Sequence, residues 1–310
     1  MSTIQKVYLS GLGAIGSAYA SRLYESDPGL VTVIADPERI ERYRRQGIVV
    51  NGREYPFRFV TPEAAAEPAD LILIAVKQHH LAESIRAIRN VVGERTIILS
   101  LLNGITSEEL IGAEYGPDKL LYSFVVGTDA VREGTRTRFS SMGKIVFGDK
   151  LNRTASPKVA AVKELFDRAG VPYQIPEDML RELWWKFMMN VGVNQTSAVL
   201  KAPYGVFQKV GEARELMTMA SCEVIRLAQK QGINLSEEDI RDYIGIINGL
   251  SPQGKTSMLQ DVEAGRKTEV EIFAGTVVSL GRQYGVATPV NEVLLRMIRT
   301  LERTYRGIPE

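Results

Sequence analysis

The sequence contains few of the residues that usually mark disulfides, metal centres or strongly charged binding surfaces. Cys222 is the one cysteine among 310 residues, which excludes an internal disulfide and a cysteine-based metal cluster. The two histidines, His79 and His80, are adjacent and cannot share one face of a regular element, so we expect no metal site. Thirty-eight basic and 37 acidic side chains leave a net charge of +1, which gives no reason to expect nucleic acid as a partner.

Long apolar segments are also absent. No stretch approaches the roughly 20 apolar residues that span a bilayer, and the first apolar run, 7–12, is interrupted by Ser10 and Gly11. We therefore expect no targeting segment, no membrane partner and a cytoplasmic location. The composition is 45% hydrophobic and 24% charged, which is typical of a globular protein.

The first half of the chain alternates short apolar runs with helical patterns. Strands that are apolar on both faces and alternate with helices indicate a parallel sheet covered by helices. The stretches TRTRFSSM and KIVFG, joined through Gly143, are expected to form a hairpin that closes this sheet. The other predicted strands are 6–10, 31–35, 71–76, 96–102 and 120–126.

The pattern changes near residue 150. Asn, Ser, Pro and Lys cluster in 148–159, and almost every later segment has a helical period. The sequence thus predicts an α/β fold, with a dinucleotide-binding domain over residues 1–152 and an all-helical domain over 153–310.

A glycine-rich turn follows the first predicted strand. Its pattern is G-x-G-x-x-G, in which the first glycine permits a tight turn, the second lets a pyrophosphate approach the backbone, and the third lets helix and strand pack closely. The phosphates would meet free N–H groups at the start of the helix. A turn that binds nothing is the alternative. The predicted cofactor-binding residues here are Gly11, Leu12, Gly13, Ala14, Ile15 and Gly16.

Charged residues at the same sheet edge affect the choice of cofactor. Asp36 ends the second strand, where a carboxylate can bond a ribose 2′-hydroxyl and repels the 2′-phosphate of NADP. This favours NAD, although Arg39 or Arg42 could reach such a phosphate. Lys77 ends another strand and can pair with a cofactor phosphate, with a solvated lysine as the alternative.

The stretch ELWWKFMMNVGVNQTSAVL carries a polar stripe on an apolar helix. Lys186, Asn190 and Asn194 are spaced i, i+4 and i+8, so they fall on one face. Buried polar groups need partners, which a ligand can supply, and a lysine among aromatics can have a lowered pKa and act as an acid–base group. The alternative is that Glu182 pairs with Lys186 and that both asparagines face solvent or neighbouring helix ends.

Three further candidates lie outside that helix. Asn103, in LLNGI, follows a strand at the carboxyl edge of the sheet, where open α/β sheets bind ligands, although Asn-Gly is also a good turn. Ser257 and Glu269 lie in KTSMLQDVEAGRKTEVE, which by composition alone is a solvated helix and loop.

These motifs together resemble the ketopantoate reductases. Four motifs occur in the family's order over nearly the whole chain: the glycine turn, LLNGI, K-x-x-x-N-x-x-x-N and SMLQDVEAGRKTEVE. The last motif is the most specific of the four. The resemblance implies a Rossmann domain followed by a helical substrate-binding and catalytic domain, as in 6-phosphogluconate dehydrogenase. It also implies reduction of ketopantoate by NADPH on the route to pantothenate, and somewhat favours a homodimer.

The resemblance further assigns roles to the candidate residues. Lys186 matches the family's proton donor, and Glu269 matches the acid near substrate and nicotinamide. Asn190, Asn194 and Ser257 match substrate-binding residues, Asn103 matches an asparagine that borders the nicotinamide site, and Lys77 matches a lysine that helps to bind the cofactor.

Two departures from the family leave other functions open. Asp36 stands where the family usually has a basic residue, and Gln195 and Tyr204 stand where many members have Pro and Asn. An NAD-dependent D-2-hydroxyacid dehydrogenase acting on another branched 2-keto acid is therefore one alternative. A non-catalytic NAD(P) sensor is another, although a sensor needs no acid beside the nicotinamide.

Overall fold

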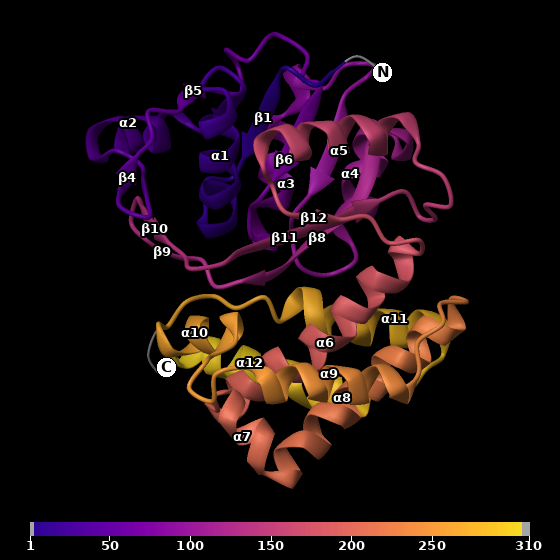
Figure 1. Cartoon of the computed structure of the whole chain (residues 1–310). Coiled ribbons are helices and arrows are strands. Elements are labelled where there is room, and N and C mark those ends of the chain that lie inside the picture. The colour runs from indigo at the N-terminus through magenta and orange to yellow at the C-terminus, as the bar shows by residue number, and fades with distance from the viewer. Residues whose placement is uncertain (1–2, 306–310) are drawn as a thin grey trace. The chain divides into compact units, whose positions relative to one another are not determined.

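The computed structural model describes residues 3–305, which form two compact units that divide between Leu180 and Arg181 (Figure 1). The first unit contains an eight-stranded sheet in the order β12-β11-β8-β7-β6-β1-β2-β5. Every residue of β1, β2, β6 and β7 is buried, which explains why these strands are predominantly apolar. The strands are β1 (Val7–Ser10), β2 (Val31–Ile34), β5 (Arg58–Val60), β6 (Leu71–Ile74), β7 (Ile97–Ser100), β8 (Leu120–Thr128), β11 (Met142–Gly148) and β12 (Tyr173–Gln174).

Helices cover both faces of this sheet, as the sequence predicts. The neighbouring strands β8, β7, β6, β1, β2 and β5 all pair in parallel. Their carboxyl ends therefore lie at the same edge of the sheet. One apolar core includes Tyr19 and Phe166 from two helices, and a second core includes Leu81 and Ile111 from two others. The helices are α1 (Ala14–Ser26), α2 (Pro37–Gln46), α3 (Leu81–Ala87), α4 (Ser107–Tyr115) and α5 (Pro157–Ala169), with short 3₁₀ turns η1 (Gln78–His80), η2 (Arg89–Val91) and η3 (Pro117–Lys119).

The predicted hairpin through Gly143 is wrong. Gly143 lies inside β11, with φ of +70°, and β11 pairs antiparallel with β8 on both sides of it. The residues expected to form the first strand instead enter a separate four-stranded sheet in the order β4-β3-β10-β9. Its strands are β3 (Val49–Val50), β4 (Arg53–Glu54), β9 (Val131–Glu133) and β10 (Arg136–Arg138).

The compact units divide later in the chain than the predicted domain boundary at 152/153. Helix α5 contacts α1, and β12 extends the large sheet by pairing with β11. Both elements therefore pack with the first unit, because their apolar residues, such as Phe166 and Val171, complete the core on one face of the sheet.

The regular secondary structure of the second unit is all helical within its described residues, 181–305. Helix α6 (Met179–Leu200) leads the chain into it, and no described helix of the protein is long and apolar enough to span a membrane. The segment that precedes α11 forms a single π-helical turn, η4 (Glu271–Gly275). The other helices are α7 (Tyr204–Lys209), α8 (Gly211–Lys230), α9 (Glu237–Gly249), α10 (Ser257–Glu263), α11 (Thr276–Tyr284) and α12 (Pro289–Thr304).

Candidate active site

The three glycines of the turn between β1 and α1 have different structural roles. Gly11 has φ of +101°, and a Cβ atom there would lie 2.6 Å from the Ala75 carbonyl oxygen. A Cβ atom on Gly16 would lie well inside 3.0 Å of the Gly11 carbonyl oxygen. On Gly13, by contrast, the nearest atom would be 3.8 Å away, an ordinary contact. The protein's own packing therefore requires Gly11 and Gly16, whereas Gly13 leaves room for a ligand against the backbone.

The start of α1 suits an anion. Gly13 is its N-cap and provides no side-chain hydrogen bond, and no acidic residue lies in the first turn. Backbone N–H groups at such a helix end are without intrahelical partners and attract phosphate.

Asp36 serves as the N-cap of α2. Its Oδ1 accepts a hydrogen bond from the Arg39 backbone N–H at 2.7 Å, and its Oδ2 lies 3.3 Å from Arg39 Nε. A second acid, Glu83, lies 3.5 Å from Arg39 Nη1. The negative charge of Asp36 is thus partly offset by Arg39, which weakens the repulsion that Asp36 alone would exert on a 2′-phosphate.

Arg132, which the sequence analysis did not single out, lies beside the glycine turn. Its Nη1 donates to Ser17 Oγ at 3.1 Å, and Ser17 Oγ lies 3.4 Å from the Leu12 carbonyl oxygen. Its guanidinium and that of Arg42 lie 5.6 and 5.4 Å from the centre of the Tyr43 ring. Burial lowers the Arg132 pKa, and no carboxylate in residues 3–305 pairs with it. A positive charge without an acidic partner beside this turn favours phosphate binding.

Lys77 and Asn103 follow neighbouring parallel strands. Lys77 comes three residues after β6, and Asn103 comes three residues after β7, so both lie at the carboxyl edge of the sheet with the glycine turn. Both are half-buried, and Gly104, with φ of +92°, turns the chain after Asn103. Open α/β sheets bind ligands at this edge.

A buried acid holds the end of the Asn103 loop. Glu108, in the first turn of α4, accepts a hydrogen bond from Ser107 Oγ at 2.9 Å, and Ser100 Oγ donates to Ser107 Oγ at 2.8 Å. Burial raises the pKa of Glu108 to about 7. Because Ser100 and Ser107 flank the loop, these bonds fix both of its ends.

Helix α6 presents the predicted polar stripe. Lys186 is half-buried, and burial lowers its pKa to about 8. It forms no ion pair with any described residue; the Glu182 carboxylate instead lies 3.7 Å from Arg181. Asn190 is 4% exposed and Asn194 7% exposed, and the Asn194 side chain has no hydrogen-bond partner among residues 3–305. The Asn194 amide is therefore available to hydrogen-bond a ligand; it is not among the fully buried side-chain groups that lack a partner.

Ser257 and Glu269 lie in the segment that follows α9. Ser257 is exposed and begins α10, directly after the N-cap Thr256, whose Oγ1 lies 3.2 Å from Ser197 Oγ near the end of α6. Glu269 is half-buried and precedes η4. The expectation of a solvated helix and loop is wrong for α10, since Met258 and Leu259 are buried.

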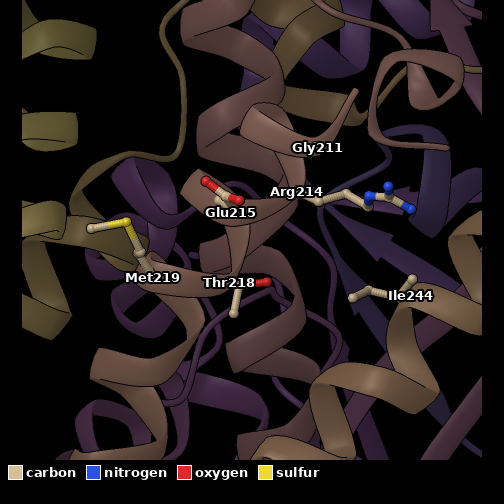
Figure 2. Close-up of a pocket in the computed structure, with 6 residues that line it drawn as sticks. All are labelled: Gly211, Arg214, Glu215, Thr218, Met219 and Ile244. Atoms are coloured by element: carbon tan, nitrogen blue, oxygen red, sulfur yellow. The ribbon is translucent and has the colours of Figure 1, made fainter. Parts of the chain in front are cut away.

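The predicted residues thus divide between the two units, with the glycine turn, Asp36, Lys77 and Asn103 in the first and the others in the second. Two surface pockets lie away from these residues. The first, of about 480 Å³, is lined by residues of α8 and α9 that include Arg214, Met219 and Ile244 (Figure 2). The second, of about 460 Å³, lies beside η4. Neither is lined by a predicted site residue. Within residues 3–305 no group of three or more His, Cys, Asp or Glu side chains is placed to hold a metal ion.

Known families match both units. Residues 7–152 match the family model described as ketopantoate reductase PanE/ApbA, and residues 178–302 match its C-terminal counterpart. The 2-dehydropantoate 2-reductase of Aquifex aeolicus is 28% identical over 96% of this chain and 97% of that relative. Among solved structures, the 2-dehydropantoate 2-reductase of Geobacter metallireducens is 25% identical, with a TM-score of 0.84 over 95% of this chain and 99% of the other.

A structure with a different activity has the same fold. The ternary structure of a D-mandelate dehydrogenase with NADH and anilino(oxo)acetate is 22% identical, with a TM-score of 0.84 over 97% of this chain and 99% of the other. At this identity the likeness shows the fold alone, and a fold does not determine the activity.

Proposed function

The chain belongs to the ketopantoate reductase family of NAD(P)-dependent oxidoreductases, and we propose that it reduces ketopantoate to D-pantoate by hydride transfer from a nicotinamide cofactor. The observation that carries the proposal is Lys186, a half-buried lysine with no acidic partner among the described residues, in line with Asn190 and Asn194 on α6. This arrangement suits a substrate that brings both a carbonyl oxygen and a carboxylate.

Lys186 is proposed to be the general acid. The nicotinamide supplies the hydride to the carbonyl carbon when it is bound. As the carbonyl π electrons move to oxygen, the Lys186 ammonium stabilises the growing negative charge and transfers its proton, which leaves an alcohol and a neutral amine. Asn190, Asn194 and Ser257 offer amide and hydroxyl donors for the substrate carboxylate and hydroxyl groups. Glu269 is proposed as the second catalytic residue, an acceptor for a substrate or nicotinamide donor.

The pKa of Lys186 predicts the pH dependence of the reaction. Burial moves this pKa from 10.5 to about 8, so the ammonium required for reduction is lost as the pH rises through about 8. We expect kcat for reduction to fall about tenfold per pH unit above 8, and the oxidation rate to rise from pH 6 to 8. Initial rates in both directions test this, and a reduction rate that stays level from pH 7 to 10 would contradict it.

The first unit would hold the dinucleotide. Its phosphates would occupy the free space over Gly13 at the N-terminus of α1, where Arg132 and Lys77 offer positive charge. Asp36 would accept a hydrogen bond from a ribose hydroxyl. Arg39 is shared between Asp36 and Glu83, whereas Arg132 adds a positive charge that no described carboxylate pairs with, and on that charge we propose NADPH as the hydride donor.

Asp36→Asn is expected to shift the cofactor preference further toward NADPH. Asparagine is also a good N-cap, so α2 should remain intact, while the repulsion of a 2′-phosphate is removed and a strong acceptor for the ribose hydroxyl is lost. The dissociation constant should fall severalfold for NADPH and rise severalfold for NADH, measured by quenching of protein fluorescence. An equal change for both cofactors would show that Asp36 does not face the ribose.

A panel of 2-keto acids tests the proposed substrate. Tyr204 favours a second candidate, an NADH-dependent D-2-hydroxyacid dehydrogenase, because its half-buried ring lies directly against Gly254, three residues before Ser257. Ketopantoate, 2-ketoisovalerate, 2-ketoisocaproate and phenylglyoxylate should each be assayed with NADPH and NADH. The highest kcat/KM for ketopantoate supports the proposal, and a preference for a substrate without a hydroxyl group supports the second candidate.

A homodimer and a cytoplasmic location remain predictions. The third alternative is a non-catalytic NAD(P) sensor, which would not need the proton donor Lys186. Turnover of any 2-keto acid would exclude this alternative.

A further inference from the structure

A buried polar network connects four elements of the second unit. Gln195 and Asn291 are completely buried, and Glu223 is 1% exposed. Gln195 Nε2 donates to Asn291 Oδ1 at 3.1 Å, and Asn291 Nδ2 donates to Glu223 Oε2 at 2.7 Å. Glu223 in turn accepts from the backbone N–H groups of Val290 and Asn291, at 2.8 and 3.0 Å, in the first turn of α12. The carboxylate thereby meets the positive end of that helix.

The network determines which way the Gln195 amide points. Its Nε2 also donates to the Val191 carbonyl oxygen at 2.9 Å, so both N–H bonds of the amide are used on acceptors. Its Oε1 is then directed at the backbone N–H of Ala274, which it accepts at 2.9 Å. The reverse orientation of the amide would point Nε2 at the Ala274 N–H and Oε1 at the Val191 carbonyl oxygen, at a cost of about 1–3 kcal/mol for each unsatisfied group.

Ala274 lies in η4, the π-helical turn that follows Glu269. In this turn the Gly275 N–H donates to the Val270 carbonyl oxygen, and the Ile272 N–H donates to the Glu269 carbonyl oxygen, at 3.0 and 3.1 Å. Single π-helical turns are rare in proteins, and those that occur are often found at functional sites. Gln195 therefore ties this turn directly to α6, one residue after Asn194 and on the helix that carries Lys186.

We propose that Gln195 is a positioning residue, which holds the segment carrying Glu269 in a fixed place against α6. The inference rests on the roles proposed above for Lys186 and Glu269. It assigns no contact between Gln195 and the substrate; Gln195 acts through the Ala274 amide, and Asn291 and Glu223 keep its own amide oriented.

Hydrogen exchange tests the tie without any assay of activity. In Gln195→Met, amide exchange over 271–276 is expected to become at least tenfold faster. Gln208→Met is the matched control, because Gln208 Nε2 donates to the carbonyl oxygens of Ile247 and Leu250, at the end of α9. Gln208→Met should lose two hydrogen bonds while the rate of amide exchange over 271–276 stays unchanged. Unchanged exchange in Gln195→Met, or an equal change in both variants, would overturn the proposal.

A more conservative variant covers the case in which Gln195→Met does not fold. Gln195→Glu, with its buried carboxyl protonated at acidic pH, keeps an acceptor oxygen for the Ala274 N–H and an O–H donor in place of Nε2, so exchange over 271–276 should remain within about threefold of the parent protein at the same pH. Fast exchange in a folded Gln195→Glu would also contradict the assigned tie.

Kinetics distinguish positioning from mere stabilisation. Gln195→Met should lower kcat/KM for ketopantoate about tenfold while the dissociation constant for NADPH changes less than twofold. If Gln195 acts through Glu269, the double variant with Glu269→Gln should be no slower than Glu269→Gln alone. A double variant whose loss of kcat/KM equals the product of the two single losses would show that Gln195 does not act through Glu269. Should the parent protein reduce no 2-keto acid, the proposed function fails, and the exchange experiment still decides the tie between Gln195 and 271–276.

Discussion

Lys186→Ala is expected to lower kcat for ketopantoate reduction about 100-fold or more, with the cofactor dissociation constant changed less than twofold. Alanine removes both the proton donor and the positive charge that stabilises the developing alkoxide, an effect realised chiefly in the transition state. Cofactor affinity should persist because the glycine turn, Asp36, Lys77 and Arg132 all lie in the first unit. Rapid-mixing measurements of kcat and equilibrium titrations with NADPH provide the two numbers.

Lys186→Arg separates the roles of charge and proton transfer. Arginine keeps the positive charge, but its guanidinium does not release a proton near neutral pH. We expect a partial rate with no fall near pH 8, whereas the parent enzyme loses activity there. A Lys186→Ala enzyme with unchanged kcat would remove Lys186 from the mechanism.

The second large effect separates two glycines of the same turn. Gly13→Ala should leave the free energy of unfolding within about 1 kcal/mol of the parent, because the new Cβ meets only an ordinary contact at 3.8 Å. It should nevertheless raise the dissociation constant for NADPH at least tenfold, because the methyl group occupies the space through which a pyrophosphate reaches the backbone. Urea unfolding and NADPH titration measure the two effects.

Gly16→Ala is the matched variant with the opposite pattern. Its Cβ would collide with the Gly11 carbonyl oxygen, a backbone atom that cannot move without displacing the turn. We expect a loss of about 3 kcal/mol in the free energy of unfolding, or failure to fold. A stable Gly16→Ala protein would contradict the described turn, and a Gly13→Ala protein that binds NADPH normally would place the phosphates elsewhere.

The regular part of the fold could be predicted because its signals are local. Strands β1, β2, β6 and β7 are buried on both faces, and their sequences are accordingly predominantly apolar. The second sheet could not be predicted in the same way, because strands of two and three residues, such as β3 and β10, pair across more than 80 residues of chain. Gly143 suggested a turn, but a glycine with positive φ also occurs inside a strand, as it does in β11.

The candidate site shows the same limit. The spacing of Lys186, Asn190 and Asn194 predicts a common helix face, yet only the structure shows that Lys186 has no acidic partner among the described residues. Asp36 followed by a proline is a recognisable N-cap signal, which could have indicated its second role. Arg132 and Ser17 are 115 residues apart, and Gln195 and Asn291 are 96 apart, so no local pattern identifies either contact.

The most direct test of the proposed function is to add ketopantoate to the purified protein with NADPH, and separately with NADH, while following absorbance at 340 nm and identifying the product by chiral chromatography. We predict rapid oxidation of NADPH with one D-pantoate formed for each cofactor consumed, and slower oxidation of NADH. No oxidation of either cofactor by ketopantoate, with turnover only of another 2-keto acid, would contradict the proposal and identify the protein as a D-2-hydroxyacid dehydrogenase built on the same fold.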